Sequence, residues 1–177
     1  MNPDSDYVAA IWRKFLVLGP PPRLMRHVEL VMEAAELILD KLLHLEIDSI
    51  RDDRVRAGVI LHDAGKILHP DEIDEPGNLH ERAGYDLVSR EIDISLARHC
   101  LTHAQWRHMS CSAEELIVAL SDSLWKGRRW QDLEEVVIRL MGDACGDDKR
   151  WAVHMQLDTL FEEIAAGGHD RLERSRV

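Results

Sequence analysis

Residues 57–66 read AGVILHDAGK, an apolar run that leads directly into His62 and Asp63. Asp63 falls four residues after Val59, as on one face of a helix, and Gly65 is a typical residue just beyond a helix end. Neighbouring helix positions point about 100° apart, so the two polar side chains converge on one ion only near such an end, or if the carboxylate reaches towards a second metal. A helix C-terminus also carries partial negative charge, which favours a cation. The stretch therefore predicts an apolar helix that ends in a metal-binding pair.

The dipeptide alone is weak evidence for such a site. The chain has 10 His and 18 Asp among its 177 residues, so about one neighbouring His-Asp pair is expected by chance. A second pair, His169-Asp170, does occur, and we interpret it as such a coincidence. The weight of His62-Asp63 comes from its place at the end of an apolar helix.

The rest of the chain predicts an all-α protein. Nearly every segment places apolar residues at helical spacing, and no segment shows the convincing alternation of a strand. The stretch 66–77 contains two prolines and four carboxylates and is expected to be a solvated connection. Beyond it, Asn78 and Glu81 have the spacing of a helix capping box. Helices are expected at about 4–18, 23–44, 48–64, after Asn78, and at 93–108, 112–127, 131–143 and 147–166.

This pattern indicates one domain, because no repeat or internal boundary stands out. A chain of 177 residues is long enough for a single substantial core. We expect a bundle of about seven or eight helices over residues 1–166, with the metal-site core at about 23–129. The polar residues 167–177, which follow the end of the last apolar stripe, are expected to form a flexible tail.

The charge of the chain narrows the classes of partner. A net charge of -11, spread along the sequence, repels nucleic-acid backbones and anionic membranes. We therefore expect neither a polynucleotide nor a membrane as partner. A small phosphorylated substrate remains compatible with this charge if a metal ion and a few local cations reverse the field at one site. The sequence leaves open whether the protein is a monomer or a homodimer.

The cysteines and the N-terminal residues indicate a cytoplasmic protein. Cys100, Cys111 and Cys145 are odd in number and form no C-x-x-C pair, which suits a reducing compartment. The first residues, MNPDSDYV, lack the basic and apolar regions of a signal peptide. No apolar run approaches the length that is needed to cross a bilayer.

Two further polar residues fall on apolar helix faces. His27 lies at the edge of the core-facing stripe of its helix, and Asp122 lies in a segment that is apolar nearly all round. A carboxylate buried there without a partner is costly, so cationic side chains or a metal must compensate. Each residue taken alone is as well explained by a hydrogen-bonded core histidine, or by an aspartate that caps a helix or forms a salt bridge.

Taken together, the residues resemble the HD-domain superfamily of metal-dependent phosphohydrolases. The family pattern is an early His, then a His-Asp pair, then a distant Asp, each on a different helix of a bundle. His27, the pair His62-Asp63 in LHDAGK, and Asp122 in ALSDSLWKGRR match this pattern in order. The resemblance spans about Arg23 to Arg129.

The resemblance also implies additional ligands, because family members with two metals add histidines between the pair and the last Asp. His80 in NLHERAG matches the family's H-x-x-x-G. Either His103 or His99 matches the second added histidine, and we favour His103. Imidazole and carboxylate ligands suit one or two divalent ions of Fe, Mn, Zn, Co or Ni. The chain lacks the Gly-Tyr-Pro signature of the branch that acts on cyclic dinucleotides.

The family mechanism assigns roles to these residues. Asp63 would bridge two ions, which would lower the pKa of bound water to about 7 so that it attacks phosphorus at neutral pH. Lys66, one helical turn past His62, is a candidate contact to a phosphate or a leaving group. Lys126, Arg128 and Arg129 follow Asp122 and form the densest basic cluster near the site. Lys126 and Arg129 are candidate substrate contacts, and a solvated helix end is the alternative interpretation for all three.

Three functional hypotheses follow. The first is a phosphohydrolase that acts on a nucleotide, a dinucleotide or another small phosphate ester. The second is a di-iron oxygenase, because a minority of HD-domain proteins resemble this class and the same ligands hold mixed-valent iron. The third is a non-catalytic helical binding or regulatory module. Local cations favour a phosphate substrate, and metal analysis would separate the third hypothesis from the other two.

Overall fold

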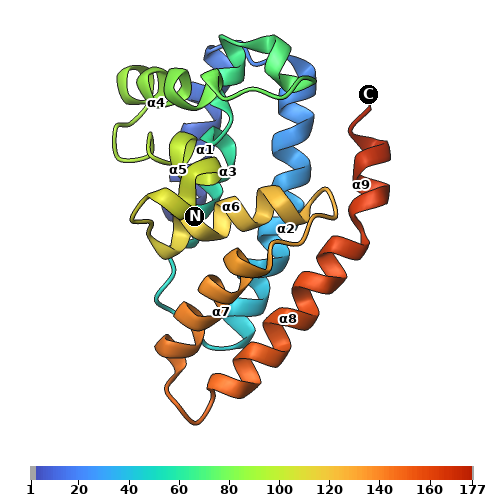
Figure 1. Ribbon diagram of the computed structural model, residues 1–177. Coiled ribbons are helices and arrows are strands. Elements are labelled where there is room, and N and C mark those ends of the chain that lie inside the picture. Colours follow the sequence, from blue (N-terminus) through green and yellow to red (C-terminus); the bar gives the residue numbers. More distant parts are fainter. Residues whose placement is uncertain (1–2, 177) are drawn as a thin grey trace.

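The computed structural model describes the backbone of residues 3–176 and the side chains of residues 6–176, and within them it contains helices and no strand (Figure 1). The predicted all-α class is confirmed. None of the described helices is both long and apolar enough to span a membrane. The α-helices are α1 (Pro3–Val17), α2 (Pro22–His44), α3 (Asp52–Leu61), α4 (Leu79–Glu91), α5 (His99–Gln105), α6 (Ala113–Leu124), α7 (Gln131–Cys145), α8 (Arg150–Ala166) and α9 (Gly168–Arg174), and the 3-10 helices are η1 (Ala64–Ile67), η2 (Pro70–Ile73) and η3 (Trp106–His108).

Helix α6 lies at the centre of the bundle. It packs against α2, α3, α5, α7 and α8, and the ribbon shows it between the α3–α5 part and the antiparallel pair α7 and α8 (Figure 1). A helix in that position has to be apolar on most of its surface. Its buried residues form a nearly continuous run, Glu115, Leu116, Ile117, Val118, Ala119, Leu120, Ser121 and Leu124. Any polar side chain on α6 that faces the neighbouring helices therefore needs a partner.

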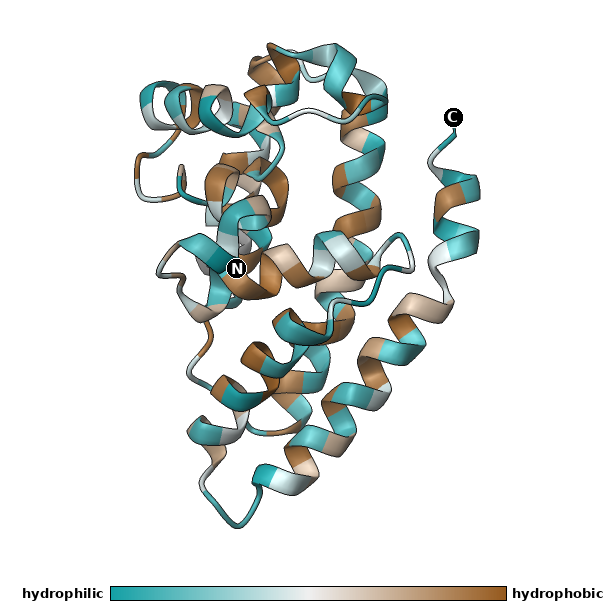
Figure 2. Ribbon diagram, in the orientation of Figure 1, coloured by the Kyte–Doolittle hydropathy of each residue, from teal (hydrophilic) through white to brown (hydrophobic). Residues whose placement is uncertain are grey.

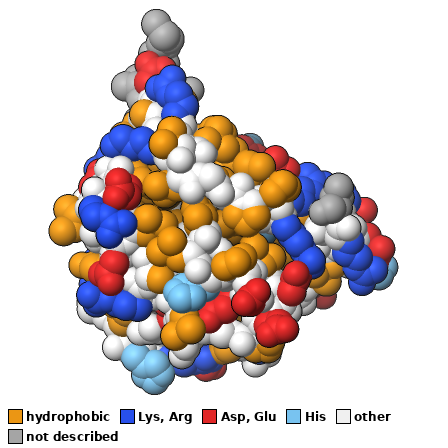
Figure 3. Space-filling model, turned by 90° about the horizontal axis from the view of Figure 1, so that it is seen from above, with side chains coloured by type: hydrophobic (Ala, Val, Ile, Leu, Met, Phe, Trp, Pro, Cys, Tyr) orange, Lys and Arg blue, Asp and Glu red, His pale blue; other side chains and the backbone are white. Residues whose placement is uncertain are grey.

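The amphipathic helices around α6 supply the other walls of the core. Helix α2 buries Leu24, Val28 and Val31 and continues this apolar stripe to Leu42. Hydrophobic residues alternate with hydrophilic ones along the outer helices in the ribbon (Figure 2). Viewed from above, hydrophobic side chains gather in the middle of the surface, and charged side chains of both signs surround them (Figure 3).

Two expected helices are shorter in the structure than the sequence suggested. The helix expected at 48–64 is α3, which ends at Leu61, and Gly65 lies in η1 instead of terminating α3. The helix expected at 93–108 is only α5 followed by η3. The Asp93 carboxylate accepts a hydrogen bond from the Ser95 amide at 2.8 Å, which stabilises a turn in place of a helix.

The connection at 66–77 is more ordered than a solvated loop, because η1 and η2 occupy most of it. The expected capping box at Asn78 is wrong, since the Asn78 side chain caps nothing. The Glu72 carboxylate accepts from the backbone amides of Leu79 and His80 at 3.1 and 3.0 Å instead. A residue from the preceding connection therefore caps α4, which fixes the start of that helix relative to η2.

The C-terminal residues do not form the expected flexible tail. Residues 168–174 form α9, and Arg171 on this helix is only 7% exposed. Close packing explains the difference: a Cβ atom at Gly168 would lie 2.3 Å from the backbone nitrogen of Gly127. Helix α9 thus packs directly on the turn that follows α6.

Candidate metal centre

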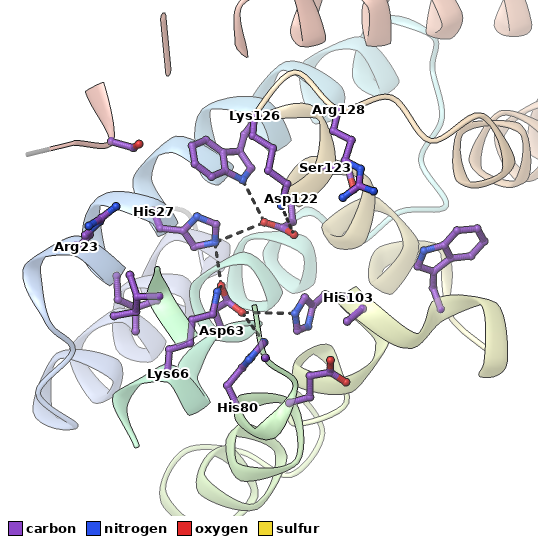
Figure 4. Close-up of a pocket in the computed structure, with 18 of the residues that line it drawn as sticks. Arg23, His27, Asp63, Lys66, His80, His103, Asp122, Ser123, Lys126 and Arg128 are labelled. Atoms are coloured by element: carbon purple, nitrogen blue, oxygen red, sulfur yellow. Dashed lines mark hydrogen bonds and ion pairs between the residues drawn. The ribbon is translucent and has the colours of Figure 1, made fainter. Parts of the chain in front are cut away.

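Polar side chains from five parts of the chain converge at one pocket of about 470 Å³ (Figure 4). Five of the six residues line the pocket, and His62 is fully buried beside them. The contributors are His27 from α2, His62 and Asp63 after α3, His80 from α4, His103 from α5 and Asp122 from α6. The structure therefore brings together all six residues that the sequence suggested as metal ligands.

Asp63 lies at the centre of this cluster, and its two carboxylate oxygens face different neighbours. Oδ2 lies 3.1 Å from His27 Nε2 and 3.6 Å from His62 Nε2. Oδ1 lies 3.3 Å from His80 Nε2 and 3.5 Å from His103 Nε2. The carboxylate thus stands between two pairs of histidines, which is the arrangement that a bridging ligand requires.

The six residues divide into two groups that could each hold an ion. In each group, one ligand atom per residue lies within 4.8 Å of the others. The first group is His27, His62 and Asp122, and the second is Asp63, His80 and His103.

The end of α3 explains how two adjacent residues reach the same site. His62 is the C-cap of α3, and Asp63 leaves the helix with φ -107° and ψ 15°. Because the chain is no longer helical at Asp63, its side chain turns towards the cluster that His62 also faces. The sequence argument that the pair must lie near a helix end is confirmed, although the helix stops earlier than expected.

Hydrogen bonds on the far side of the rings fix which nitrogen faces the cluster. His62 Nδ1 donates to the Val59 carbonyl at 2.8 Å, and His103 Nδ1 donates to the His99 carbonyl at 3.1 Å. A carbonyl only accepts, so Nδ1 carries the proton in both rings, and Nε2 of each neutral ring presents a lone pair. Bonds of this kind orient the rings of metal-binding histidines.

Two buried atoms of the cluster have no hydrogen-bond partner within the described residues. Asp63 Oδ1 and His80 Nε2 are buried and make no hydrogen bond. Leaving a buried polar atom unsatisfied costs about 1–3 kcal/mol. A metal ion would satisfy all these atoms, so the residues fit a metal centre.

The electrostatics of the cluster are also those of a cation site. Burial alone would raise the pKa values of Asp63 and Asp122. Positive charge outweighs burial in both cases: His62 holds the pKa of Asp63 well below its usual range, and Lys126 does the same for Asp122. Burial lowers the pKa of His103 to about 4 and also lowers that of His27, whereas the Asp63 carboxylate outweighs burial and raises the pKa values of His62 and His80. A bound cation would take the place of the protons on these two rings. Ionised carboxylates and neutral imidazoles are the states that bind metal.

The two alternatives for the last histidine are separated by the structure. His103 Nε2 faces Asp63, whereas the His99 ring packs on α3, where a Cβ at Gly58 would lie 2.6 Å from the ring. Burial lowers the pKa of His99 to about 4, which keeps this ring neutral. His99 therefore belongs to the packing between α3 and α5, and Gly58 provides the space for it.

A glycine pair sets the distance between the His-Asp segment and α4. A Cβ at Gly65 would lie 1.9 Å from the His80 carbonyl and 2.6 Å from the Gly84 nitrogen. A Cβ at Gly84 would in turn lie 2.9 Å from the Gly65 nitrogen. These two glycines let the backbones touch, which brings His80 next to Asp63. This contact gives a physical reason for the spacing His80-x-x-x-Gly84.

Two lysines line the pocket beside the candidate ligands. Lys66 Nζ lies 2.6 Å from Asp63 Oδ2, and Lys126 Nζ lies 3.4 Å from Asp122 Oδ2 (Figure 4). Both lysines line the pocket, as the sequence suggested for substrate contacts. Trp125 is buried beside them, where its Nε1 donates to Asp122 Oδ1 at 3.2 Å. This tryptophan therefore orients a candidate ligand, in addition to packing in the core.

The suggestion that Arg129 contacts substrate does not fit the structure. Arg129 forms ion pairs with Glu134 and Asp158, at 2.5 and 2.6 Å, and does not line the pocket. Its neighbour Arg128 lines the pocket instead and lies over the Trp130 ring at 4.5 Å from the centroid. Both arginines follow Gly127, whose φ of +77° marks a turn just after α6.

Sequence reasoning missed the role of Glu72. Its Oε2 accepts a hydrogen bond from His80 Nδ1 at 2.5 Å, so that His80 Nε2 faces Asp63. The backbone amides of Leu79 and His80 hold the pKa of Glu72 at about 2, together with the His80 side chain. Nothing in the acidic stretch around Glu72 distinguishes it from three neighbouring carboxylates, and only the fold shows which one reaches His80.

We expect Glu72→Gln to weaken metal binding at the group that contains His80. The carboxylate strengthens the ligand and fixes its tautomer, and loss of such a partner costs about 10- to 100-fold in metal affinity or activity. Titration of the metal-stripped protein with Co²⁺ would measure this. Glu75→Gln, a change to an exposed carboxylate of the same connection, is the matched control and should bind as the wild type does. Equal affinity of both variants would show that Glu72 has no such role.

Comparison with known proteins decides the family. The family model described as "HD domain" matches residues 24–141, which is well over half of the chain. The chain belongs to the HD-domain family. This membership indicates a metal-dependent hydrolase, and the match spans every residue of the metal cluster in this HD-domain protein. Searches of curated proteins and of solved structures gave no match.

Proposed function

We propose that this HD-domain protein hydrolyses a small phosphate ester or phosphoanhydride, such as a nucleotide or a dinucleotide, with two divalent transition-metal ions. The observation that carries the proposal is the position of Asp63, whose two oxygens face two separate groups of ligands inside a pocket lined by cations. His27, His62 and Asp122 would hold one ion, His80 and His103 the other, and Asp63 both. Nitrogen and oxygen ligands of this kind suit Fe, Mn, Zn, Co or Ni.

The protein's own residues would bind and orient the substrate. Bound ions of this type supply Lewis acidity, which activates water and offsets negative charge on phosphoryl oxygens. Lys66 and Lys126 place positive charge at the same end of the pocket, where they would hold a phosphoryl group. Trp125 and Glu72 keep Asp122 and His80 in place through hydrogen bonds.

The charge around the pocket favours an anionic substrate. Four cationic side chains line it, Arg23, Lys66, Lys126 and Arg128, against the carboxylates of Asp63, Glu81 and Asp122. The local balance is thus positive in a chain whose net charge is -11. A volume of about 470 Å³ lies in the usual range for small-molecule sites, which supports a small substrate over a polymer.

The test is a panel of nucleotides, dinucleotides and simple phosphate esters, assayed with Mn²⁺, Co²⁺, Ni²⁺, Mg²⁺ and Fe²⁺. The proposal expects phosphate release that a chelator abolishes and added metal restores. Oxygen consumption without phosphate release would support the di-iron oxygenase instead. Absence of any bound metal, with an unchanged fold after His62→Ala, would leave the non-catalytic module.

Arg128 is the pocket cation that we expect to contact the substrate away from the metals. No carboxylate in the described part of the chain pairs with Arg128, whereas Lys66, Lys126 and Arg23 each have one. We expect Arg128→Gln to raise KM about tenfold with little change in kcat, because a charged hydrogen bond is lost equally from substrate and transition state. Steady-state kinetics on the best substrate of the panel would measure this.

Arg82→Gln is the matched control for that experiment. Arg82 also lies over an aromatic ring, that of Tyr85 at 5.2 Å, but it does not line the pocket. Its KM should equal that of the wild type. Arg128→Lys should lie between the two, since it keeps the charge but loses the planar contact with Trp130. An unchanged KM in Arg128→Gln would remove Arg128 from the substrate site.

A further inference from the structure

A buried arginine on the C-terminal helix has no part in the site described so far. Arg171 is 7% exposed, and its guanidinium donates only to backbone carbonyls: Nε to Trp125 at 2.8 Å, and Nη2 to Leu124 at 3.3 Å and to Ile164. No carboxylate of the described residues pairs with it directly. Burying a guanidinium is costly, and these carbonyls at the ends of α6 and α8 are groups that a helix leaves without partners.

Two of the three carbonyls that accept from Arg171, those of Leu124 and Trp125, lie just after Asp122 in the chain. The side chain of Trp125 donates to Asp122 Oδ1 at 3.2 Å, and its ring lies edge-on to the His27 ring, with centroids 5.1 Å apart. A short path of contacts therefore runs from Arg171 through the Trp125 residue to two candidate ligands, His27 and Asp122. Both belong to the first of the two metal groups.

Helix α9 also contacts α2 next to His27. The Arg174 guanidinium pairs with both carboxylate oxygens of Glu33, at 2.8 and 2.7 Å. The Arg174 carbonyl accepts a hydrogen bond at 3.0 Å from Nε of Arg26, the residue before His27. Helix α9 thus contacts α2 and the end of α6, the two elements that carry His27 and Asp122, and it lies outside the stretch 24–141 that the family model matches.

We infer that Arg171 is a positioning residue for the metal group formed by His27, His62 and Asp122. Arg171 fixes the Trp125 backbone, Trp125 orients Asp122, and Arg174 holds α2 in register beside them. The second group, with Asp63, His80 and His103, does not contact α9. The inference rests on the proposed metal centre, and it predicts that a change at Arg171 affects one ion much more than the other.

The experiment is a Co²⁺ titration of the metal-stripped protein, followed by visible absorption and by thermal unfolding without metal. Asp122→Asn and His103→Ala identify which binding step belongs to which group. Arg171→Met should weaken the step assigned with Asp122 by about 10- to 100-fold, as loss of an orienting contact does, and leave the other within about threefold. Arg171→Lys should restore part of the affinity, because it keeps a donor at that position.

The control is Arg150→Met, on α8, whose guanidinium pairs with Asp143 and Asp147 far along the chain from the ligands. This variant should bind both ions as the wild type does. If Arg171→Met does not fold, the milder changes Arg171→Lys and Glu33→Gln test the same inference. Glu33 is half-exposed, and its replacement removes only the ion pair that joins α9 to α2 through Arg174.

Three results would overturn the inference. Unchanged affinity in folded Arg171 variants would show that α9 does not position the ligands. Equal weakening of both steps, together with lower stability, would assign Arg171 a purely structural role. A wild-type protein that binds no metal would reject both this inference and the proposed function, whereas the first two results would reject this inference alone.

Discussion

Asp63→Asn is expected to lower kcat by at least about 100-fold and to weaken the binding of both metal ions. Loss of a residue that only orients a ligand costs about 10- to 100-fold in metal affinity or activity, and loss of a ligand itself should cost no less. Asp63 is the residue whose Oδ1 and Oδ2 face the two histidine pairs. An amide keeps the shape of the side chain but presents one oxygen and no charge. Metal content of the purified variant, together with its phosphate release, would measure the effect.

Asp122→Asn is the variant with which the metal content of Asp63→Asn should be compared. Asp122 belongs to only one ligand group, so its loss should weaken one ion and largely spare the other. Asp86→Asn, which changes an exposed carboxylate that pairs with Arg82, should leave metal content and activity unchanged. If Asp63→Asn retained both metals and full activity, Asp63 would not be the shared ligand.

Gly65→Ala is expected to be the most damaging small change outside the ligands. The added Cβ would lie 1.9 Å from the His80 carbonyl and 2.6 Å from the Gly84 nitrogen, both of them backbone atoms that cannot rotate away. We expect a loss of about 1–3 kcal/mol or more in the free energy of unfolding, as for other overpacked sites. The forced separation of η1 from α4 would also move His80 away from Asp63. Urea denaturation and Co²⁺ titration would measure the two effects.

Gly142→Ala is the matched control, because Gly142 is also a buried helical glycine. The closest atom to a Cβ there would be Cγ of the flexible Arg150 side chain, at 3.0 Å, and the Arg150 Cα would lie at 3.8 Å, an ordinary van der Waals contact. Since alanine favours a helix by up to about 1 kcal/mol over glycine, this variant should be as stable as the wild type or more so. A Gly65→Ala protein of wild-type stability would contradict the close backbone contact.

The sequence predicts the elements that carry the site because their patterns are local. The apolar run of α6 and the stripe of α2 need no tertiary information, and each contains a polar residue that has no reason to be there without a partner. Those residues are Asp122 and His27. The His-Asp pair at the end of α3 adds the third element. In each case burial of the polar side chain costs free energy unless the side chain has a partner, and the local pattern alone shows that the residue lies on an apolar face.

Interactions between elements that lie far apart in the sequence are not readable in this way. Glu72 reaches His80 only because η2 folds back on α4, and Arg171 reaches the Trp125 carbonyl from 46 residues away. The choice between Arg128 and Arg129 depends on Glu134 of α7 and Asp158 of α8, which pair with Arg129 and leave Arg128 to line the pocket. The local pattern suggested Arg129 as the substrate contact, and only the fold shows that Arg128 lines the pocket instead.

The central claim is that two ions share Asp63. The measurement that tests it most directly is an anomalous scattering map from crystals of the protein loaded with a transition metal. The account predicts two peaks, one among His27, His62 and Asp122 and the other among His80 and His103, each within about 2.0–2.2 Å of its nitrogen and carboxylate ligands, with Asp63 between them. Metal bound elsewhere, or no metal at this cluster, would contradict it.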